Sequence, residues 1–355
     1  MVGLDTVPMF VGMGLSVLQP RGSGALSMAT KPLPAPLPQV SVIVLAGGEG
    51  TRLCPLIDRW LGRRIPKQYC AFYGKQTLLD HTLRRARQLA VDSRIVTIIG
   101  AGHRQFIEAG HETEFPGLLI EQPSAKDTGP GVFLPLCYLR ARDPEATVVI
   151  LPSDHFIYPE EGFRDQMSAA VQVVEAYPDR LLLLSAEPHY PEPDYGWIQP
   201  GDPLVHEGCR PREVRCFREK PTRELAELYL QAGFLWNTLI TVAKAETLWN
   251  LGLRLVPEAM RRYKLLYELL TRIRRGVDAA ESEMRFIARI YETLEPFNFS
   301  DRILEGAYES CLVLPLTDVA WSDLGRPQRV IETLSAAGQK SNLPDELVKW
   351  VSDQG

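Results

Sequence analysis

The residues that could bind phosphate begin with a glycine-rich segment, Leu45–Leu56, which reads LAGGEGTRLCPL and follows a short apolar run. Glycines after an apolar strand let backbone N–H groups approach an anion closely, and Arg52 adds a fork of donors that matches phosphate oxygens. The segment lacks the Lys and Ser/Thr of a Walker loop, and Leu53 stands where the dinucleotide pattern needs its third glycine. The segment is therefore either a phosphate loop of another kind or a tight turn with a solvated arginine.

Charged side chains in three later loops extend this possible chemistry. Lys67 follows a basic segment, Asp154 comes directly after the apolar run TVVIL, and Asp323 follows another strand-like segment. Aspartates at strand ends can hold Mg²⁺, and two of them from distant loops can share one ion that bridges phosphates. Taken singly, each residue also has a simpler interpretation, as a solvated lysine or as an aspartate that caps a turn or helix.

Other catalytic arrangements find less support in the sequence. Neither Ser153 nor Ser322 lies in a G-x-S-x-G elbow, which favours direct displacement at phosphorus over a covalent intermediate. His155 could ligate zinc, but no cluster of partner ligands accompanies it. The six cysteines show no metal-binding spacing, and free thiols in a reducing cytoplasm are the interpretation that we adopt.

Apolar runs and helical periodicity indicate the elements that must position these loops. Strand and helix alternate in the first half, which predicts an α/β fold with a Rossmann-like, mainly parallel sheet flanked by helices. In such sheets ligands bind beyond the carboxyl ends of the strands, where the polar loops lie. The expected strands are 40–46, 94–100, 117–121, 147–151, 181–185, 195–199, 213–219, 234–242 and 310–316, and the expected helices are 76–91, 129–140, much of 244–293, 326–337 and 344–351.

Composition limits the classes of partner. The net charge of −5 and the lack of a long basic run argue against a nucleic-acid groove. No apolar run approaches the ~18 residues of a membrane span. We therefore expect a cytoplasmic globular protein that binds neither nucleic acid nor membrane, while association into a homo-oligomer stays open.

The two ends of the chain are predicted to differ from its centre. Residues 1–39 are rich in Gly, Pro and Met, and Asp5 precedes any basic residue, unlike a secretory signal. We expect a disordered leader here, or a true start near Met28. The predicted domain covers 40–325, and 326–355 is expected to form a short helical tail.

The quoted loops together resemble the sugar-1-phosphate nucleotidyltransferases, and most closely their mannose-1-phosphate guanylyltransferase branch. The PKQ and FLWN forms indicate that branch. The resemblance covers about four fifths of the chain and rests on segments in family order: LAGGEGTRLCPL, IPKQY, EQPSAKDTGP, VILPSDH, DYGWI, FREKP, GFLWNT and WSDLG. It implies the nucleotide-diphospho-sugar transferase fold with a small sugar-binding subregion, Mg²⁺ as cofactor, and an NTP and a sugar 1-phosphate as substrates.

Roles for individual residues follow from the resemblance alone. Arg52, Lys67 and Asp154 would be catalytic, with Arg52 on the leaving phosphates and Lys67 beside the α-phosphorus, and Asp154 and Asp323 would hold Mg²⁺. The expected nucleotide-binding residues are Leu45, Ala46, Gly47, Gly48, Gln122, Pro123 and Gly129. The residues expected to bind the sugar phosphate are Gly196, Glu219, Lys220 and Asn237.

The implied reaction is the attack of a sugar 1-phosphate on an NTP, with release of pyrophosphate. GTP and mannose 1-phosphate are the expected substrates, and GDP-mannose is the expected product. The sequence departs from the family at Cys54, Asp127 and Leu239, and after Asp323 it reads Gly325-Arg326-Pro327 in place of the usual Gly-Ser-Trp. A UDP-, dTDP- or ADP-sugar pyrophosphorylase is one alternative, and a catalytically inactive paralogue that binds nucleotide-sugar and regulates a partner is another.

Overall fold

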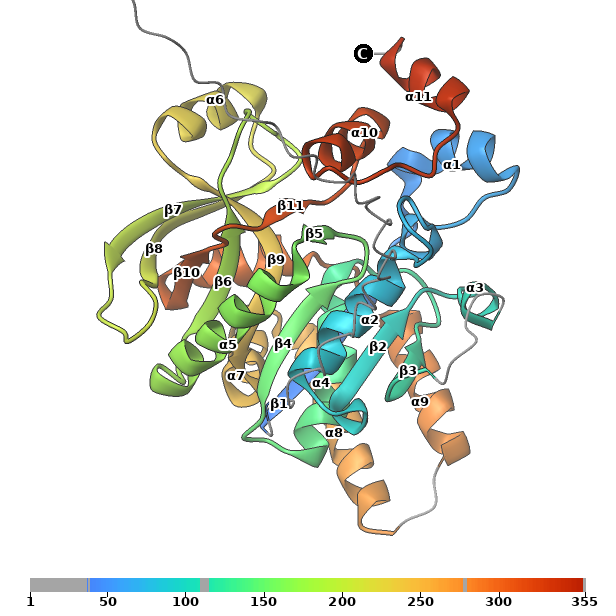
Figure 1. Cartoon of the computed structure of the whole chain (residues 1–355). Coiled ribbons are helices and arrows are strands. Elements are labelled where there is room, and N and C mark those ends of the chain that lie inside the picture. The colour runs from blue at the N-terminus through green and yellow to red at the C-terminus, as the bar shows by residue number, and fades with distance from the viewer. Residues whose placement is uncertain (1–36, 38, 109–114, 277–279, 354–355) are drawn as a thin grey trace, which may run out of the picture. The chain divides into compact units, whose positions relative to one another are not determined.

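The computed structural model describes residues 37, 39–108, 115–276 and 280–353, and these residues form one compact unit around a nine-stranded sheet (Figure 1). The strand order is β3-β2-β1-β4-β9-β6-β10-β8-β7. The predicted leader, 1–39, lies outside the described residues except for Leu37 and Gln39. The strands are β1 Val40–Ala46, β2 Ile95–Ile99, β3 Leu118–Glu121, β4 Thr147–Pro152, β6 Leu181–Ala186, β7 Gly196–Pro203, β8 Arg212–Glu219, β9 Leu235–Lys244 and β10 Cys311–Pro315.

The sheet is mixed, although most of its strands point the same way. β3, β2, β1 and β4 pair in parallel, as do β6 and β10, whereas β9 and β8 pair antiparallel to every neighbour. The α/β class and the mainly parallel direction are confirmed. The reversal of β9 was not foreseen, because a strand buried on both faces has the same apolar run in either direction.

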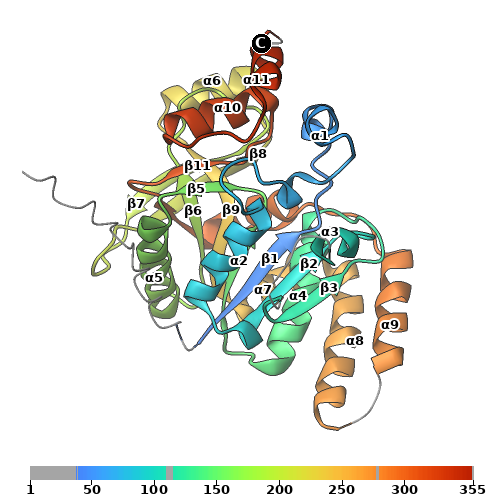
Figure 2. The same cartoon turned by 45° about the vertical axis from the view of Figure 1, so that its right-hand side comes forward.

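Helices cover both faces of the sheet (Figure 2). Along β1 the side chains alternate: Ile43 joins the core beneath α4 and α8, while Val42 and Val44 join the core beneath α2 and α5. This period of two is what a strand buried on both faces requires. The helices are α1 Cys54–Leu61, α2 Leu78–Leu89, α3 Arg104–Glu108, α4 Thr128–Arg142, α5 Glu160–Ala176, α6 Arg223–Gln231, α7 Ala245–Leu255, α8 Pro257–Arg274, α9 Ala280–Thr293, α10 Pro327–Ala336 and α11 Asp345–Ser352.

A separate two-stranded ladder joins the middle and last thirds of the chain. β5 (Phe156–Tyr158) pairs antiparallel with β11 (Ala320–Ser322), and Trp321 lies opposite Ile157. Asp154 lies just before β5, and Asp323 lies just after β11. In an antiparallel pair these two positions fall at the same end, so the ladder brings both aspartates to one place.

The predicted C-terminal tail is not separate from the domain. Val330 and Leu334 of α10, with Val351 of α11, share an apolar cluster with Leu56 and Ile57 of α1. These contacts pack α10 and α11 onto α1. The helices expected at 326–337 and 344–351 are present, and their apolar faces cover the helix that follows the glycine-rich loop.

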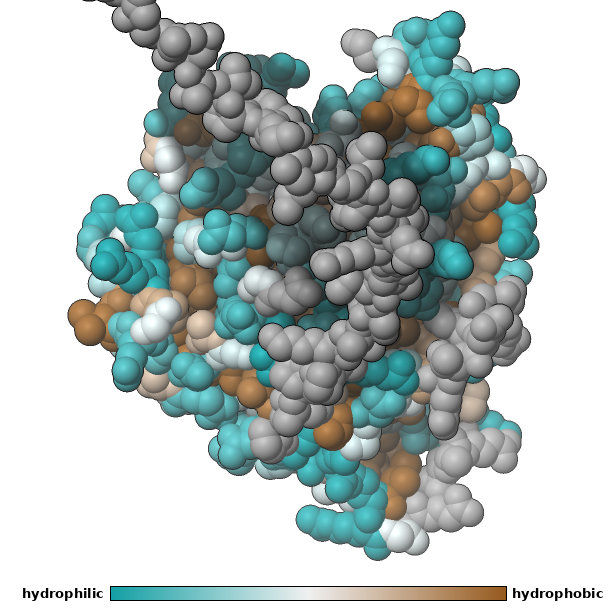
Figure 3. Space-filling view, in the orientation of Figure 1, coloured by the Kyte–Doolittle hydropathy of each residue, from teal (hydrophilic) through white to brown (hydrophobic). Residues whose placement is uncertain are grey.

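The exposed surface visible in Figure 3 is largely hydrophilic, and its apolar side chains lie in scattered groups. Single exposed apolar residues, such as Leu228 and Leu265, are ordinary on a protein surface. Within the described residues, no helix combines the length and apolar character needed to cross a bilayer.

Glu160, the first residue of α5, should stabilise the fold above pH 5. It pairs with Arg84, with the fully buried Arg85 at 3.3 Å, and with His81. Burial alone would raise the pKa of its carboxyl, but the hydrogen bonds from His81 and Arg84 and the charge of Arg85 lower it to about 2. Glu160→Gln should cost about 3 kcal/mol of unfolding free energy at pH 7, since the Arg85 charge loses its partner.

The sign of the pH effect follows from the lowered pKa. The contribution of the Glu160 carboxylate to the free energy of unfolding is complete above the ordinary glutamate pKa of about 4.3, and it is lost as the pH falls toward 2. The unfolding free energies of the wild type and of Glu160→Gln, measured with urea, should therefore converge as the pH falls from about 5 to about 2.5. Glu227→Gln, which removes an exposed ion pair with Arg223, is the control and should change stability by less than about 0.5 kcal/mol. If the difference in unfolding free energy between the wild type and Glu160→Gln stays constant with pH, the lowered pKa of Glu160 is contradicted.

Candidate active site

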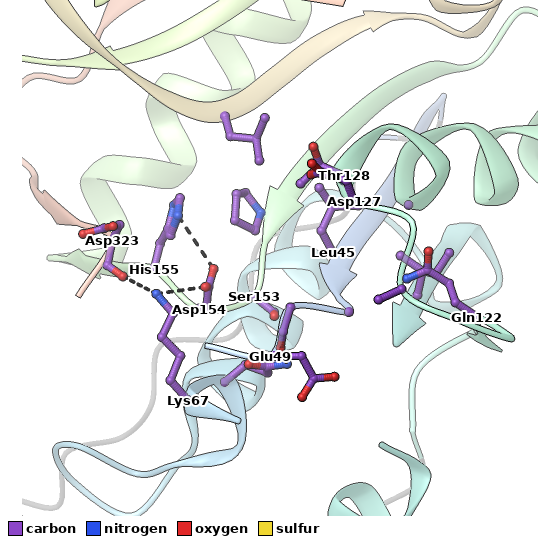
Figure 4. A pocket seen from close by; sticks show the side chains of 18 of the residues that line it. Leu45, Glu49, Lys67, Gln122, Asp127, Thr128, Ser153, Asp154, His155 and Asp323 are labelled. Carbon is purple, nitrogen blue, oxygen red and sulfur yellow. Dashed lines mark hydrogen bonds and ion pairs between the residues drawn. The ribbon is translucent and has the colours of Figure 1, made fainter. Parts of the chain in front are cut away.

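A pocket of about 370 Å³ opens at the carboxyl ends of β1 and β4, where the polar loops were expected to meet (Figure 4). The glycine-rich loop forms one side, and the loop after β4 forms another. Most of the predicted nucleotide-site and catalytic residues line it: Leu45, Gly47, Gly48, Arg52, Lys67, Gln122, Asp154 and Asp323. The structure thus brings together residues from five separate segments of the chain, as the topology rule predicts.

The glycine-rich loop is held by side chains from its neighbours. Nε2 of Gln68 donates to the carbonyl oxygens of Ala46, at 3.0 Å, and of Gly48, at 2.8 Å. A Cβ on Gly47 would lie only 2.5 Å from Nε2 of Gln122, so a larger residue would displace that side chain. Gly50 has φ +61°, a conformation that favours glycine. Close approach therefore explains Gly47 and backbone conformation explains Gly50, whereas the space around Gly48 would admit a side chain.

Lys67 lies between the two aspartates. Its Nζ is 2.9 Å from Oδ2 of Asp154 and also donates to the backbone carbonyl of Asp323 (Figure 4). The lysine side chain is 7% exposed, so its charge is shielded from water. Burial alone would raise the pKa of Asp154, but Lys67 and then His155 hold it below its usual range, and the carboxyl is ionised at neutral pH.

Asp323 is fixed by three donors on one carboxylate oxygen. Oδ1 accepts from the hydroxyl of Tyr195 at 2.6 Å, from Arg329, and from the backbone N–H of Gly325. Oδ2 has a looser contact, 3.3 Å to Arg52. Although burial favours the neutral acid, Lys67 and Arg329 keep the pKa of Asp323 well below its usual range.

Sequence reasoning missed the residues that support the aspartates. His155 is buried, and its Nδ1 accepts from Nε1–H of Trp321 at 3.2 Å, which leaves the proton on Nε2, facing Asp154. Arg329 and Tyr195 hold Asp323. The contacts of Tyr195 with Asp323 and of Trp321 with His155 join residues far apart in the chain, and no local pattern signals them.

A second, smaller pocket of about 180 Å³ adjoins the first and has Asp323, Thr128, His155 and Leu239 in common with it. The four residues expected to bind the sugar phosphate all line this pocket: Gly196, Glu219, Lys220 and Asn237. They come from β7, β8 and β9, together with the residue after β8. Two pockets with a common wall suit two substrates that must react with each other.

Glu219 is the least satisfied side chain of the second pocket. Its Oε2 is buried and has no hydrogen-bond partner within the described part of the chain. Burial raises the pKa of its carboxyl to about 7, and Glu305 nearby adds to the increase. A buried acceptor without a partner fits a ligand hydroxyl.

Three predicted nucleotide-binding residues are not among those lining the main pocket. Ala46 contributes its carbonyl to the hydrogen bonds of Gln68, and Pro123 lines a different cavity beside β3 and α9. Gly129 packs against Phe297, and a Cβ there would lie 2.1 Å from its ring. This contact accounts for the glycine without any ligand, while Asp127, Thr128 and Gly131 around it do face the pocket.

The donor set at this site fits Mg²⁺. Two ionised carboxylates, Asp154 and Asp323, lie on one wall, and oxygen is the ligand atom that Mg²⁺ prefers. Oδ2 of Asp323 is only loosely engaged. No cluster of three or more His, Cys, Asp or Glu side chains suited to a metal occurs among the described residues. The remaining ligands would have to be water and phosphate oxygens, as is usual for Mg²⁺ bound together with a nucleotide.

The family model described as nucleotidyl transferase matches residues 41–340. The chain belongs to this family. As a member it has the expected fold, and the resemblance inferred from the loops is confirmed at the level of the family.

Two of the curated relatives are named as mannose-1-phosphate guanylyltransferases. The chain is 30% identical to mannose-1-phosphate guanylyltransferase 2 of Escherichia coli O157:H7 over 81% of its own length and 58% of that protein. It is 28% identical to mannose-1-phosphate guanylyltransferase of Klebsiella pneumoniae over 80% of its own length and 57% of that protein. The chain thus spans little more than half the length of these relatives.

A crystal structure of mannose-1-phosphate geranyltransferase, so described, from Thermus thermophilus shares the fold. The TM-score is 0.67 at 24% identity, and the match covers 84% of this chain and 79% of that one. At this identity the match supports the α/β fold and its sheet order rather than a substrate.

Proposed function

We propose that this chain transfers a nucleotidyl group from GTP to mannose 1-phosphate, forming GDP-mannose and releasing pyrophosphate. The observation that carries the proposal is the pair of adjoining pockets that have Asp323 in common, with Lys67 between Asp323 and Asp154 in the larger pocket. The names of the curated relatives support the choice of substrates.

The reaction needs positioning more than acid–base chemistry. An oxygen of the sugar phosphate forms a bond to the α-phosphorus of GTP, while the bond from that phosphorus to the bridging oxygen of the β-phosphate breaks. The attacking phosphate is already an anion, so no proton has to be removed. Lys67 would offset the negative charge around the α-phosphorus, and Arg52 would bind the departing pyrophosphate.

Asp154 and Asp323 would hold Mg²⁺ in the larger pocket, and Asp323 also lines the smaller one. When bound, the ion would neutralise phosphate charge and orient the triphosphate. Tyr195 and Arg329 would keep Asp323 in place, and His155 would do the same for Asp154. Holding both substrates in line in this way supplies much of the rate enhancement expected of such an enzyme.

Pyrophosphate release tests the proposal directly. The protein is incubated with each of GTP, ATP, UTP and dTTP against mannose 1-phosphate and glucose 1-phosphate, with and without Mg²⁺. The expected result is the highest kcat/KM for GTP with mannose 1-phosphate, and activity that depends on the metal. A preference for another pair would favour a UDP-, dTDP- or ADP-sugar pyrophosphorylase, and tight nucleotide-sugar binding without turnover would favour the regulatory paralogue.

The raised pKa of Glu219 predicts a pH-dependent KM for the sugar phosphate. The ionised carboxylate accepts a hydroxyl hydrogen bond more strongly than the neutral acid does, so KM should fall as the pH rises through about 7. The substrate phosphate also titrates, near pH 6. Glu219→Gln keeps the shape and should retain only the part of the pH profile that belongs to the substrate. If KM depends on pH in the same way for the wild type and for Glu219→Gln between pH 6 and 8, Glu219 has no role in sugar binding.

A further inference from the structure

Three arginines and three acidic residues form a closed ring of ion pairs beside the two pockets. In order, the ion-pair ring is Arg52, Asp194, Arg326, Glu192, Arg329 and Asp323, and Asp323 contacts Arg52 again. The ring draws on the glycine-rich loop, the loop before β7, the loop after β11 and the start of α10. Arg326 and Arg329 join it because α10 packs back onto the domain.

The ring has a buried half and an exposed half. The side chains of Glu192 and Arg329 are 3% and 7% exposed, whereas those of Arg52 and Arg326 are 50% and 48% exposed. Buried charge pairs are costly to separate, while exposed pairs exchange partners for little free energy. The buried half is therefore fixed, and the exposed half is free to rearrange when a ligand arrives.

Arg52 has two competing uses in this arrangement. It lines the nucleotide pocket, where it would bind phosphate, yet its Nη1 is 2.7 Å from Oδ2 of Asp194. Nη2 of Arg326 is also 2.7 Å from that same oxygen. Asp194 thus forms ion pairs with both Arg52 and Arg326. A stronger ion pair with one arginine weakens the ion pair with the other.

We propose that Asp194 and Arg326 are positioning residues that set the nucleotide affinity through Arg52. Asp194 competes with the triphosphate for the guanidinium of Arg52, and Arg326 weakens that competition by holding Asp194. The inference rests on the proposed function only in that Arg52 binds the triphosphate. It gives Arg326, which stands where the family usually has serine, a defined role.

Calorimetric titration with GTP and Mg²⁺, without sugar phosphate, tests the competition. Asp194→Asn should tighten the Kd by about two- to fivefold, which is the range for an exposed ion pair. Arg326→Gln should weaken it by a similar factor, because Asp194 then holds Arg52 alone. The double variant should bind like Asp194→Asn, since Arg326 has lost the charge on which it acts.

An Arg52→Gln background separates competition from simple charge repulsion. In that background Asp194→Asn should give no tightening, and a gain that persists would mean that Asp194 repels the triphosphate directly, which would overturn the inference. Weaker binding by Asp194→Asn in the wild-type background would overturn it as well. Failure of the wild type to release pyrophosphate from any substrate pair would refute the proposed function instead, so the two failures are distinguishable.

Discussion

Replacing Lys67 by methionine should lower the turnover number of the nucleotidyl transfer by about 10²–10³-fold while the protein stays folded. Methionine keeps the apolar stem and removes the charge that lies between Asp154 and Asp323. Without that charge the two carboxylates face the incoming phosphates with less compensation, and the transition state loses its nearest buried cation.

The assay for this variant is pyrophosphate release at saturating substrate, with a thermal melt to confirm folding. Lys75→Met changes an exposed lysine close in sequence, so it is a matched control and should keep wild-type turnover. Lys67→Arg keeps the charge but not the compact ammonium, and we expect an intermediate loss. A turnover number for Lys67→Met within a few-fold of the wild type would rule out a catalytic role for this lysine.

Replacing Arg329 by leucine should destabilise the protein by about 3–5 kcal/mol, because it removes the buried cation that two buried carboxylates share. Arg329 pairs with Glu192 and with Asp323, and all three side chains are nearly buried. A loss of this size is a large part of a typical unfolding free energy of about 5–15 kcal/mol.

Urea unfolding at pH 7 measures this loss. Arg215→Ala removes an exposed ion pair with Asp202 and should cost less than about 1 kcal/mol, which sets the scale for an ordinary surface pair. Arg329→Lys keeps one positive charge and should recover part of the stability. If Arg329→Leu unfolds at the same urea concentration as the wild type, the buried pairs contribute nothing measurable.

The sequence allowed much of the fold to be predicted, since long apolar runs such as the one at Val40–Ala46 indicate buried strands directly. Helical structure was likewise expected over much of 244–293, where the helix Pro257–Arg274 lies. The helix at Glu160–Ala176 was not predicted. A strand-like segment was expected before Asp323, where β11 lies, but β5 and β11 are too short for any period to reveal that they pair. Their pairing is stabilised by tertiary contacts, and such contacts leave no local signature.

The candidate site could likewise be predicted from the sequence only in part. The loops that carry Lys67, Asp154 and Asp323 could be predicted because their motifs occur along the chain in the same order as in the family. The structure places the three side chains around one pocket. The role of Arg329 could not be predicted, because an arginine in an amphipathic helix is usually solvated. Only the packing of α10 onto the domain turns this side chain toward Asp323.

The ladder between β5 and β11 has a consequence for how this family can vary. Because the ladder itself ties Asp154 to Asp323, the spacing of the two acids does not depend on the lengths of the connections between them in the chain. Insertions after β6 or between α8 and α9 can lengthen the chain without altering that spacing. The spacing of the two aspartates is thus independent of the length of the outer loops, which leaves those loops free to diverge.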